Sequence, residues 1–146
     1  MALLIQNHLC SFIFANNLYI TKMIKGLGTD IVEVNRIAEK ILQDAGFKEM
    51  IFSKNEIYYC EKQTFQYEHY AARFAAKEAF FKALGTGWAT GTHFNEIEII
   101  HDANGKPFFQ LTGETKITLS PLNVENISVS LSHTKSMAIA TVIIED

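Results

Sequence analysis

The segment between residues 67 and 84 constrains the fold more than any other part of the chain. Its pattern is that of one long helix, and it ends in the tight Gly-Thr-Gly turn at 85–87. At about 100° per residue, Ala75, Ala79 and Ala83 lie on one side of this helix and form a stripe of small side chains. We therefore expect the helix to pack on the rest of the molecule by this alanine stripe.

The opposite half-turn of the helix carries its charge, on Arg73, Lys77, Glu78 and Lys82. One explanation is an ordinary solvated face, in which Glu78 and Lys82 form an i,i+4 ion pair worth about 0.2–0.5 kcal/mol. The other explanation is a site for a metal ion and phosphate groups. The helix by itself leaves both explanations open.

A second acid favours the metal and phosphate explanation. Asp30 belongs to a predicted strand at 24–33, in which Gly26 and Gly28 allow another backbone to approach closely. Mg²⁺ binds carboxylate oxygens, water and substrate phosphate, and nearby Lys and Arg side chains neutralise the remaining charge. Free backbone N–H groups in the 85–87 turn would add to such a site. The hypothesis requires Asp30 and Glu78 to meet in space.

The remaining sequence alternates strands and helices. A chain of 146 residues with 48% hydrophobic residues is long enough for one core. Ser53 and Glu56 form a capping-box signature, Asn35 is expected to cap a helix, and the Asn104-Gly105 pair predicts a hairpin. We predict strands at 24–33, 94–102, 107–113, 127–133 and 136–144, and helices at 35–45, 53–62, 67–84 and 114–119.

Charge and cysteine content exclude several classes of protein. The formal charge of −3 and the pI near 5.9 argue against a protein whose whole surface binds nucleic acid. Cys10 and Cys60 are the only cysteines and lie far apart. Neither a disulfide framework nor a zinc knuckle is therefore supported, and a cytoplasmic location fits best.

Residues 1–22 differ from the rest of the chain because they are apolar and carry no charge before Lys22. They lack the early positive charge of a secretory signal and the clean length of a membrane helix. We expect a dispensable or misassigned leader, a domain at 23–146 that starts at Met23, and no stable membrane insertion. A membrane or partner anchor is the alternative.

Four segments together resemble a known family. They are GLGTDIVEVNRI (26–37), RFAAKEAFFKALGTG (73–87), NGKP (104–107) and VSLSHTKSMAIATV (129–142). In this order they are similar to the signatures of holo-acyl-carrier-protein synthase, the small bacterial 4′-phosphopantetheinyl transferase.

The resemblance implies a fold and an activity. The expected fold is α+β, a single small domain with an antiparallel sheet packed on a long helix. The expected reaction transfers the 4′-phosphopantetheine of coenzyme A to a serine of apo-acyl carrier protein, for fatty acid biosynthesis, and releases adenosine 3′,5′-bisphosphate. The expected assembly is a homotrimer with active sites between subunits.

The resemblance also implies roles for single residues. Asp30 and Glu78 match the family's metal-binding acids and would hold Mg²⁺ against the pyrophosphate of coenzyme A. With Lys82 they form the expected catalytic set. Arg73, Lys77 and Lys82 are expected to bind coenzyme A by neutralising phosphate charge. The remaining residues expected to bind coenzyme A lie in loops: Gly85, Asn104, Gly105, Lys106, Pro107, His133 and Thr134.

Some roles keep an alternative. His133 is expected to face the cofactor, but a hairpin-turn histidine satisfied by backbone would give the same pattern. The acidic carrier is expected to dock on Arg36, Lys40 and Lys48, fewer arginines than the family often displays. The base that deprotonates the carrier serine is either a metal-activated water or a carboxylate such as Glu33.

Two rival functions follow from the same residues. A non-catalytic module that binds coenzyme A or a nucleotide would keep the basic residues without needing both acids. A metal-dependent phosphohydrolase would keep both acids and consume coenzyme A without a carrier protein.

Overall fold

The computed structural model describes residues 23–88, 90–122, 124 and 126–145. The expected leader at 1–22, which includes Cys10, lies outside the described residues, so its role stays a prediction. No helix in the described ranges combines the length and the apolar composition needed to cross a bilayer.

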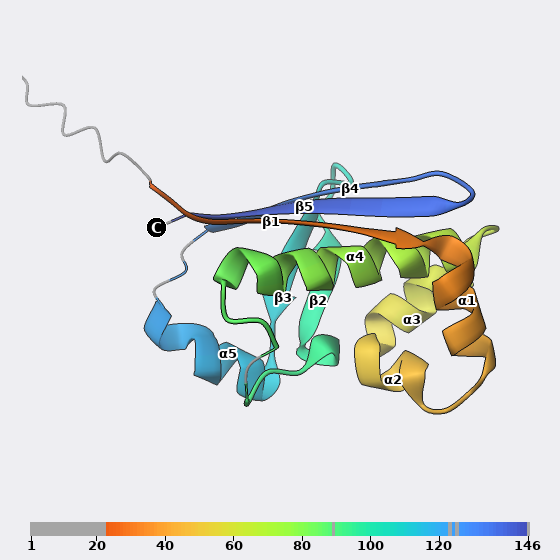
Figure 1. Ribbon diagram of the computed structural model, residues 1–146, viewed down its shortest axis with the longest axis horizontal. Helices are drawn as coiled ribbons and strands as arrows, with labels where there is room; N and C mark the ends of the chain where they lie inside the picture. The colour runs from red at the N-terminus through yellow and green to blue at the C-terminus, as the bar shows by residue number, and fades with distance from the viewer. Residues whose placement is uncertain (1–22, 89, 123, 125, 146) are drawn as a thin grey trace, which may run out of the picture.

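The described chain forms one five-stranded antiparallel sheet with the strand order β1-β5-β4-β3-β2 (Figure 1). The strands are β1 (Ile24–Glu33), β2 (Ile97–His101), β3 (Pro107–Leu111), β4 (Asn126–His133) and β5 (Met137–Glu145). The first strand therefore pairs with the last, which brings Asp30 opposite Ala140. This long-range pairing explains why the family signatures at both ends of the chain belong to one unit.

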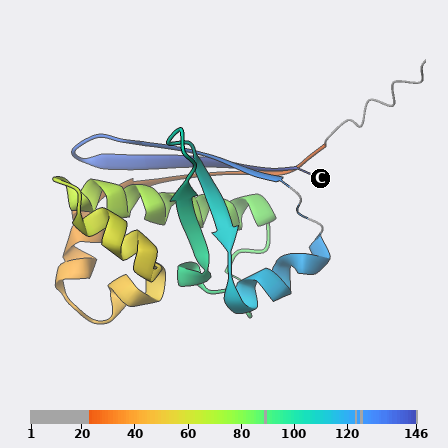
Figure 2. The same ribbon diagram turned by 180° about the vertical axis from the view of Figure 1, so that it is seen from behind.

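The sheet changes direction between β3 and β4, which share only the pair Phe108 and Ser128. The long strands β1, β5 and β4 form one layer, whereas the β2–β3 hairpin runs across α4 (Gln66–Leu84) on its other side (Figures 1 and 2). The helix therefore fills the angle of a bent sheet and contributes more buried hydrophobic residues than any other single element.

The alanine stripe of α4 packs against β1, as predicted. A Cβ placed on Gly26 would lie 1.9 Å from the backbone oxygen of Ala83, and one on Gly28 would lie 2.0 Å from that of Ala79. Only glycine leaves room for such a close contact between two backbones. Because β1 carries Asp30 and α4 carries Glu78, this contact also sets how far apart the two acids lie.

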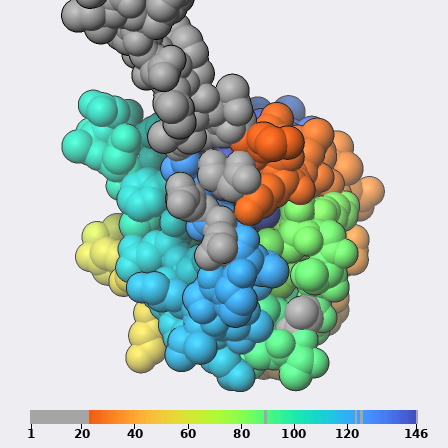
Figure 3. Space-filling model, turned by 90° about the vertical axis from the view of Figure 1, so that its left-hand side faces the viewer, coloured from red at the N-terminus to blue at the C-terminus, as the bar shows by residue number. Residues whose placement is uncertain are grey.

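Three shorter helices cover one end of α4, and the segment around α5 covers the other end (Figures 1 and 3). The three are α1 (Val34–Leu42), α2 (Phe47–Ile51) and α3 (Lys54–Glu61); the segment comprises the 3₁₀ turn η1 (Phe94–Glu96), α5 (Gly113–Leu119) and the 3₁₀ turn η2 (Ser120–Leu122). The helix α2 was not predicted. Five residues are too short to show a helical period.

The sequence placed most helix ends correctly. Ser53 and Glu56 form the predicted capping box at the start of α3, and Gly85 ends α4 in the left-handed conformation. Asn35, in contrast, does not cap α1. The cap position is Glu33, which makes no capping bond with its side chain, and the N–H of Val34 instead donates to the backbone oxygen of Ser136 (2.9 Å). The neighbouring β-turn therefore takes the place of a capping side chain.

Candidate active site

The charged residues of α4 do not share one side of the helix. Arg73 and Lys82 are nine residues apart, which places them roughly 180° from each other. Arg73 and Lys77 point into the molecule and are buried, whereas Glu78 is partly buried and Lys82 is exposed at the β1 edge. The prediction that the four charges share one side is wrong, because Arg73 and Lys77 are buried in the core whereas Lys82 is exposed beside β1.

Lys77 is a buried structural residue. Its ammonium lies 2.6 Å from Oε2 of Glu56 and donates to the backbone oxygens of Ile51 and Phe94, each at 2.8 Å. Both side chains of the ion pair are fully buried, and burial lowers the pKa of Lys77 while the Glu56 carboxylate opposes that shift. With all its protons engaged, Lys77 has none left for a phosphate, which contradicts its predicted role in binding coenzyme A.

Lys82 and Asp30 form the exposed part of the predicted metal site. The ammonium of Lys82 donates to Oδ1 of Asp30 (2.8 Å) and to the backbone oxygen of Thr29 (3.1 Å). The side chain of Lys82 is 53% exposed and that of Asp30 is 16% exposed. The strand and the helix therefore meet here, and the ammonium of Lys82 lies against the carboxylate of Asp30.

Glu78 faces the same edge. Burial, followed by the charge of Asp30, raises the pKa of Glu78, and the positive charges of Lys82 and Arg36 oppose this shift. Glu78 makes no hydrogen bond or ion pair with any described residue, so its carboxylate is free to take a ligand. Two acids that repel each other, one of them without a partner, fit a site for a divalent cation.

The two acids are the protein's whole contribution to such a site within a single chain. The described residues contain no cluster of three or more His, Cys, Asp and Glu side chains able to hold a metal. Mg²⁺ tolerates this shortage, because it commonly keeps several waters and uses one or two carboxylates together with substrate phosphates. The donor set thus fits Mg²⁺ bound jointly with a phosphate compound.

A cavity of about 540 Å³ opens beside Glu78, and we call it the aromatic cavity. Its walls are mainly aromatic and its rim is basic. The residues that line it are Arg36, Lys40, Phe47, Ile51, Phe74, Glu78, Phe81, Lys82, Gly85, Gly87, Trp88 and Phe94. The predicted docking residues Arg36 and Lys40 and the predicted loop residue Gly85 therefore lie around one cavity.

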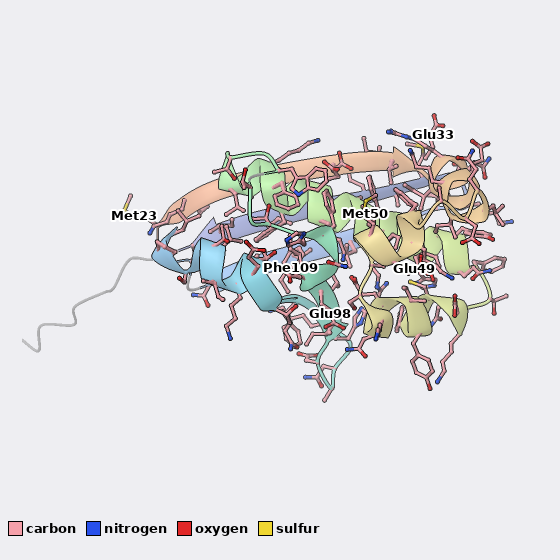
Figure 4. All side chains as sticks on the ribbon, turned by 90° about the horizontal axis from the view of Figure 1, so that it is seen from below. Met23, Glu33, Glu49, Met50, Glu98 and Phe109 are labelled. Atoms are coloured by element: carbon pink, nitrogen blue, oxygen red, sulfur yellow. The ribbon has the colours of Figure 1, made fainter. Side chains whose placement is uncertain are left out.

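A second cavity of about 580 Å³ lies on the other flank of α4, and we call it the Arg73 cavity. The guanidinium of Arg73 stacks 4.0 Å from the ring centre of Tyr59, which itself stacks on His101. Nε of Arg73 and Oε1 of Glu98 are buried without a hydrogen-bond partner among the described residues. Figure 4 shows Glu98 beside the hairpin that closes this cavity. Unpaired buried groups that line a cavity indicate a place for a polar ligand.

The hairpin loop supplies another wall of the Arg73 cavity. Gly105 lines it with a φ of 82°, and Asp102 closes the loop by accepting from the N–H groups of Asn104 and Lys106. Pro107 begins β3 directly after the loop. The predicted NGKP segment therefore lies next to Arg73 rather than next to Asp30.

His133 ends β4, which is separated from β1 by β5. Its Nδ1 lies 3.0 Å from Oε2 of Glu68, and its ring contacts that of His69. The ring is thus paired with a side chain, and not with backbone as the alternative proposed. The hydroxyl of Thr134 accepts from the N–H of Met137 (3.1 Å) inside the β4–β5 turn, so part of its bonding capacity is used by the turn.

Two other predicted residues lie away from the acids. Lys48 pairs with Glu61 (2.9 Å), which raises the pKa of Lys48, and it does not line the aromatic cavity. Glu33 is exposed at the end of β1, where Figure 4 shows it at the edge of the molecule. Because side chains alternate along a strand, Glu33 lies on the opposite face of β1 from Asp30.

Sequence reasoning missed several residues around the two cavities. None of the rings that line the aromatic cavity was predicted as a site residue. Tyr59, Glu98 and His101 gave no signal, because single residues on separate elements acquire a common environment only when the chain folds.

With this geometry in place, comparison with known proteins is decisive. Residues 26–142 match the family described as the 4′-phosphopantetheinyl transferase superfamily. The chain belongs to this superfamily. The match extends from the glycine-containing start of β1 to the last core residues of β5, so it includes both acids and both cavities.

Individual members of the superfamily give the same result. The chain is 48% identical to the holo-[acyl-carrier-protein] synthase of Ruminiclostridium cellulolyticum over 81% of its own length and 90% of the relative's length. The crystal structure of the Neisseria meningitidis holo-[acyl-carrier-protein] synthase superposes with a TM-score of 0.78 at 35% identity, covering 85% of this chain and all of that one. The Helicobacter pylori enzyme in complex with coenzyme A gives a TM-score of 0.70 at 31% identity, covering 81% and 98%.

These findings confirm the α+β fold and the family expected from the sequence signatures.

Proposed function

We propose that this protein is a holo-acyl-carrier-protein synthase that transfers 4′-phosphopantetheine from coenzyme A to a serine of apo-acyl carrier protein. The serine oxygen attacks the β-phosphorus of the pyrophosphate, and the bond from that phosphorus to the bridging oxygen breaks. Adenosine 3′,5′-bisphosphate leaves with the bridging oxygen, and the serine proton passes to a base. The observation that carries the proposal is the pair Asp30 and Glu78 beside Lys82, in a chain whose relatives catalyse this transfer.

Asp30 and Glu78 are the residues that would hold Mg²⁺. When bound, Mg²⁺ would neutralise pyrophosphate oxygens and the charge that develops on the leaving phosphate. Lys82 would add a mobile positive charge at the same edge, because its side chain is more exposed than that of Asp30. Asp30 and Glu78 would serve to orient the pyrophosphate, and neither is assigned the role of base. The serine proton then goes to water at this site, since Glu33 lies on the other face of β1.

We assign the adenosine 3′,5′-bisphosphate end of coenzyme A to the Arg73 cavity. Arg73 offers an unpaired buried Nε, and Tyr59 and His101 offer ring faces next to it. The NGKP loop borders the same space through Gly105. His133 lies on the same side of the molecule through its contact with His69.

This assignment favours more than one subunit. Arg73 and Glu78 lie on different flanks of α4 and line different cavities, so a site shared between subunits would bring the two halves of the coenzyme A site together. We therefore propose a homotrimer in which the Arg73 cavity of one subunit faces Asp30 and Glu78 of another. The outer face of β1 and β5 supports an interface, since Leu27, Ile31 and Ile139 are exposed and Ile31 pairs with Ile139 across the two strands.

The acyl carrier protein would dock over the aromatic cavity. Arg36 and Lys40 at the rim would attract an acidic helix, and the phenylalanine rings would accept its apolar side chains. Lys48 would contribute only long-range charge because Glu61 already pairs with it. The cytoplasm, where fatty acid synthesis supplies the carrier, is the proposed location, and 23–146 is the proposed catalytic domain.

Incubation with coenzyme A, Mg²⁺ and apo-acyl carrier protein tests the proposal, with the carrier weighed by mass spectrometry. We expect a mass gain equal to one phosphopantetheine, loss of the gain in Asp30→Asn and Glu78→Gln, and no effect of Glu114→Gln. Glu114 is a matched control, an exposed acid paired with His93 at 3.3 Å. Consumption of coenzyme A without a carrier would favour the phosphohydrolase, and binding without turnover would favour the non-catalytic module.

A further inference from the structure

The ammonium of Lys82 lies where a cation is needed at Asp30. It donates to Oδ1 of Asp30 at 2.8 Å and is held in place by a second bond to the backbone oxygen of Thr29 at 3.1 Å. Asp30 makes no other side-chain hydrogen bond or ion pair among the described residues. The only strong partner of this proposed metal ligand is therefore a side chain that carries the same sign of charge as the metal.

Lys82 and a divalent cation cannot both bind the carboxylate of Asp30 favourably. An ammonium bonded to Asp30 repels a divalent cation at the same carboxylate, because like charges a few ångströms apart interact unfavourably. The same ammonium is attractive to a phosphate that arrives beside the metal. Lys82 has the freedom to change partner, since its side chain is 53% exposed on a long flexible stem. Glu78, in contrast, is partly buried and has no hydrogen-bond partner among the described residues.

We propose that Lys82 competes with the metal for Asp30 while coenzyme A is absent, and moves to the pyrophosphate when coenzyme A and the metal bind together. This inference rests on the proposed function. It predicts that the metal and coenzyme A bind cooperatively, because binding of either ligand breaks the bond between Lys82 and Asp30 and so favours binding of the other. Arg36 acts on Glu78 from α1, whereas Lys82 is the side chain bonded to Asp30, so the competition is assigned to Lys82.

The test measures binding of Mn²⁺ alone, using the electron paramagnetic resonance signal of free Mn²⁺ in the absence of coenzyme A. We expect Lys82→Met to bind Mn²⁺ about threefold to tenfold more tightly than the natural protein, the size expected for loss of one partly exposed charged bond. Lys82→Arg keeps the competing charge and should bind Mn²⁺ as the natural protein does. Lys116→Met removes an exposed lysine of α5 and is the control for net charge.

The affinity for coenzyme A should change in the opposite direction. With Mn²⁺ saturating, Lys82→Met should bind coenzyme A about tenfold more weakly, because one phosphate-neutralising charge is gone. A merely structural role for Lys82 would weaken both ligands together. Lys82→Gln, which can still donate to Thr29, repeats both measurements should Lys82→Met fail to fold.

The outcomes separate two failures. If Asp30→Asn binds Mn²⁺ as tightly as the natural protein, the metal site of the proposed function is wrong. If Asp30→Asn weakens Mn²⁺ binding but neither Lys82→Met nor Lys82→Gln strengthens it beyond the Lys116→Met control, the metal site stands and the competition by Lys82 is refuted.

Discussion

Substitution of Gly28 by alanine tests the contact that holds the two acids together. The added Cβ would lie 2.0 Å from the backbone oxygen of Ala79 and 2.6 Å from the backbone nitrogen of Ala83. Both atoms belong to the backbone of α4, so no side-chain rotation relieves the contact. The helix and β1 must separate by more than 1 Å, because ordinary van der Waals contact begins at 3.4 Å.

Two effects of opposite sign decide the change in stability. Alanine in a strand is favoured over glycine by roughly 0.5–1 kcal/mol, because glycine loses more conformational freedom on folding. Overpacking of a close-packed core costs about 1–3 kcal/mol and sometimes more. The contact at Gly28 involves two backbones, so we expect the upper end of that cost and a net loss of about 2 kcal/mol in the free energy of unfolding.

The effect on activity should exceed the effect on stability. A displacement of about 1 Å between groups that act together can cost on the order of a hundredfold in rate. Because β1 carries Asp30 and α4 carries Glu78, we expect the fully folded Gly28→Ala protein to transfer phosphopantetheine about a hundredfold more slowly. Urea denaturation measures the first quantity, and the mass gain of the carrier with time measures the second.

Gly46→Ala is the control for backbone conformation. Gly46 has a φ of 75° and nothing within 4 Å of an added Cβ, so its substitution strains the backbone without a steric contact. We expect Gly46→Ala to lose about 1 kcal/mol of stability while keeping its transfer rate. If Gly28→Ala has the stability and the rate of the natural protein, the close packing of β1 on α4 does not set the geometry of the site.

Three further predictions concern single side chains. Burial and Asp30 raise the pKa of Glu78, so its protonated form favours folding and that contribution is lost as the pH rises through the raised pKa. Without metal at pH 7, Glu78→Gln should therefore melt about 1–3 °C higher than the natural protein, and this gain should be gone near pH 4. An unchanged melting temperature at pH 7 would contradict the shift. Lys77→Met leaves the Glu56 carboxylate buried and unpaired, so we expect a loss of about 3–5 kcal/mol in urea denaturation, whereas normal stability with weak binding of coenzyme A would restore a phosphate-binding role for Lys77. Glu68→Ala removes the partner of His133, so we expect coenzyme A binding, measured by calorimetry, to weaken about tenfold. If Glu68→Ala causes the same loss in a His133→Ala protein, Glu68 acts independently of His133.

Local signals determined much of this protein before any tertiary contact was known. The alanine stripe and Gly85 define a long helix and its end, and Ser53 with Glu56 starts another helix, because these features depend on neighbours within one or two turns. The alternation along β4 and β5 likewise follows from residues two apart. The order of the family signatures added the expectation that Asp30 and Glu78 share one metal site, which no local rule supplies.

The tertiary structure alone decided what each charged residue faces. Lys77 and Lys82 lie on the same helix, yet Glu56 and two backbone oxygens enclose Lys77, while Asp30 leaves Lys82 at the surface. Likewise, Val34 found its partner in Ser136 of a distant turn, so Asn35 was not needed as a cap. Helical spacing fixes the direction of a side chain relative to its own axis, but the neighbours that bury or pair it come from strands and helices far away in the sequence.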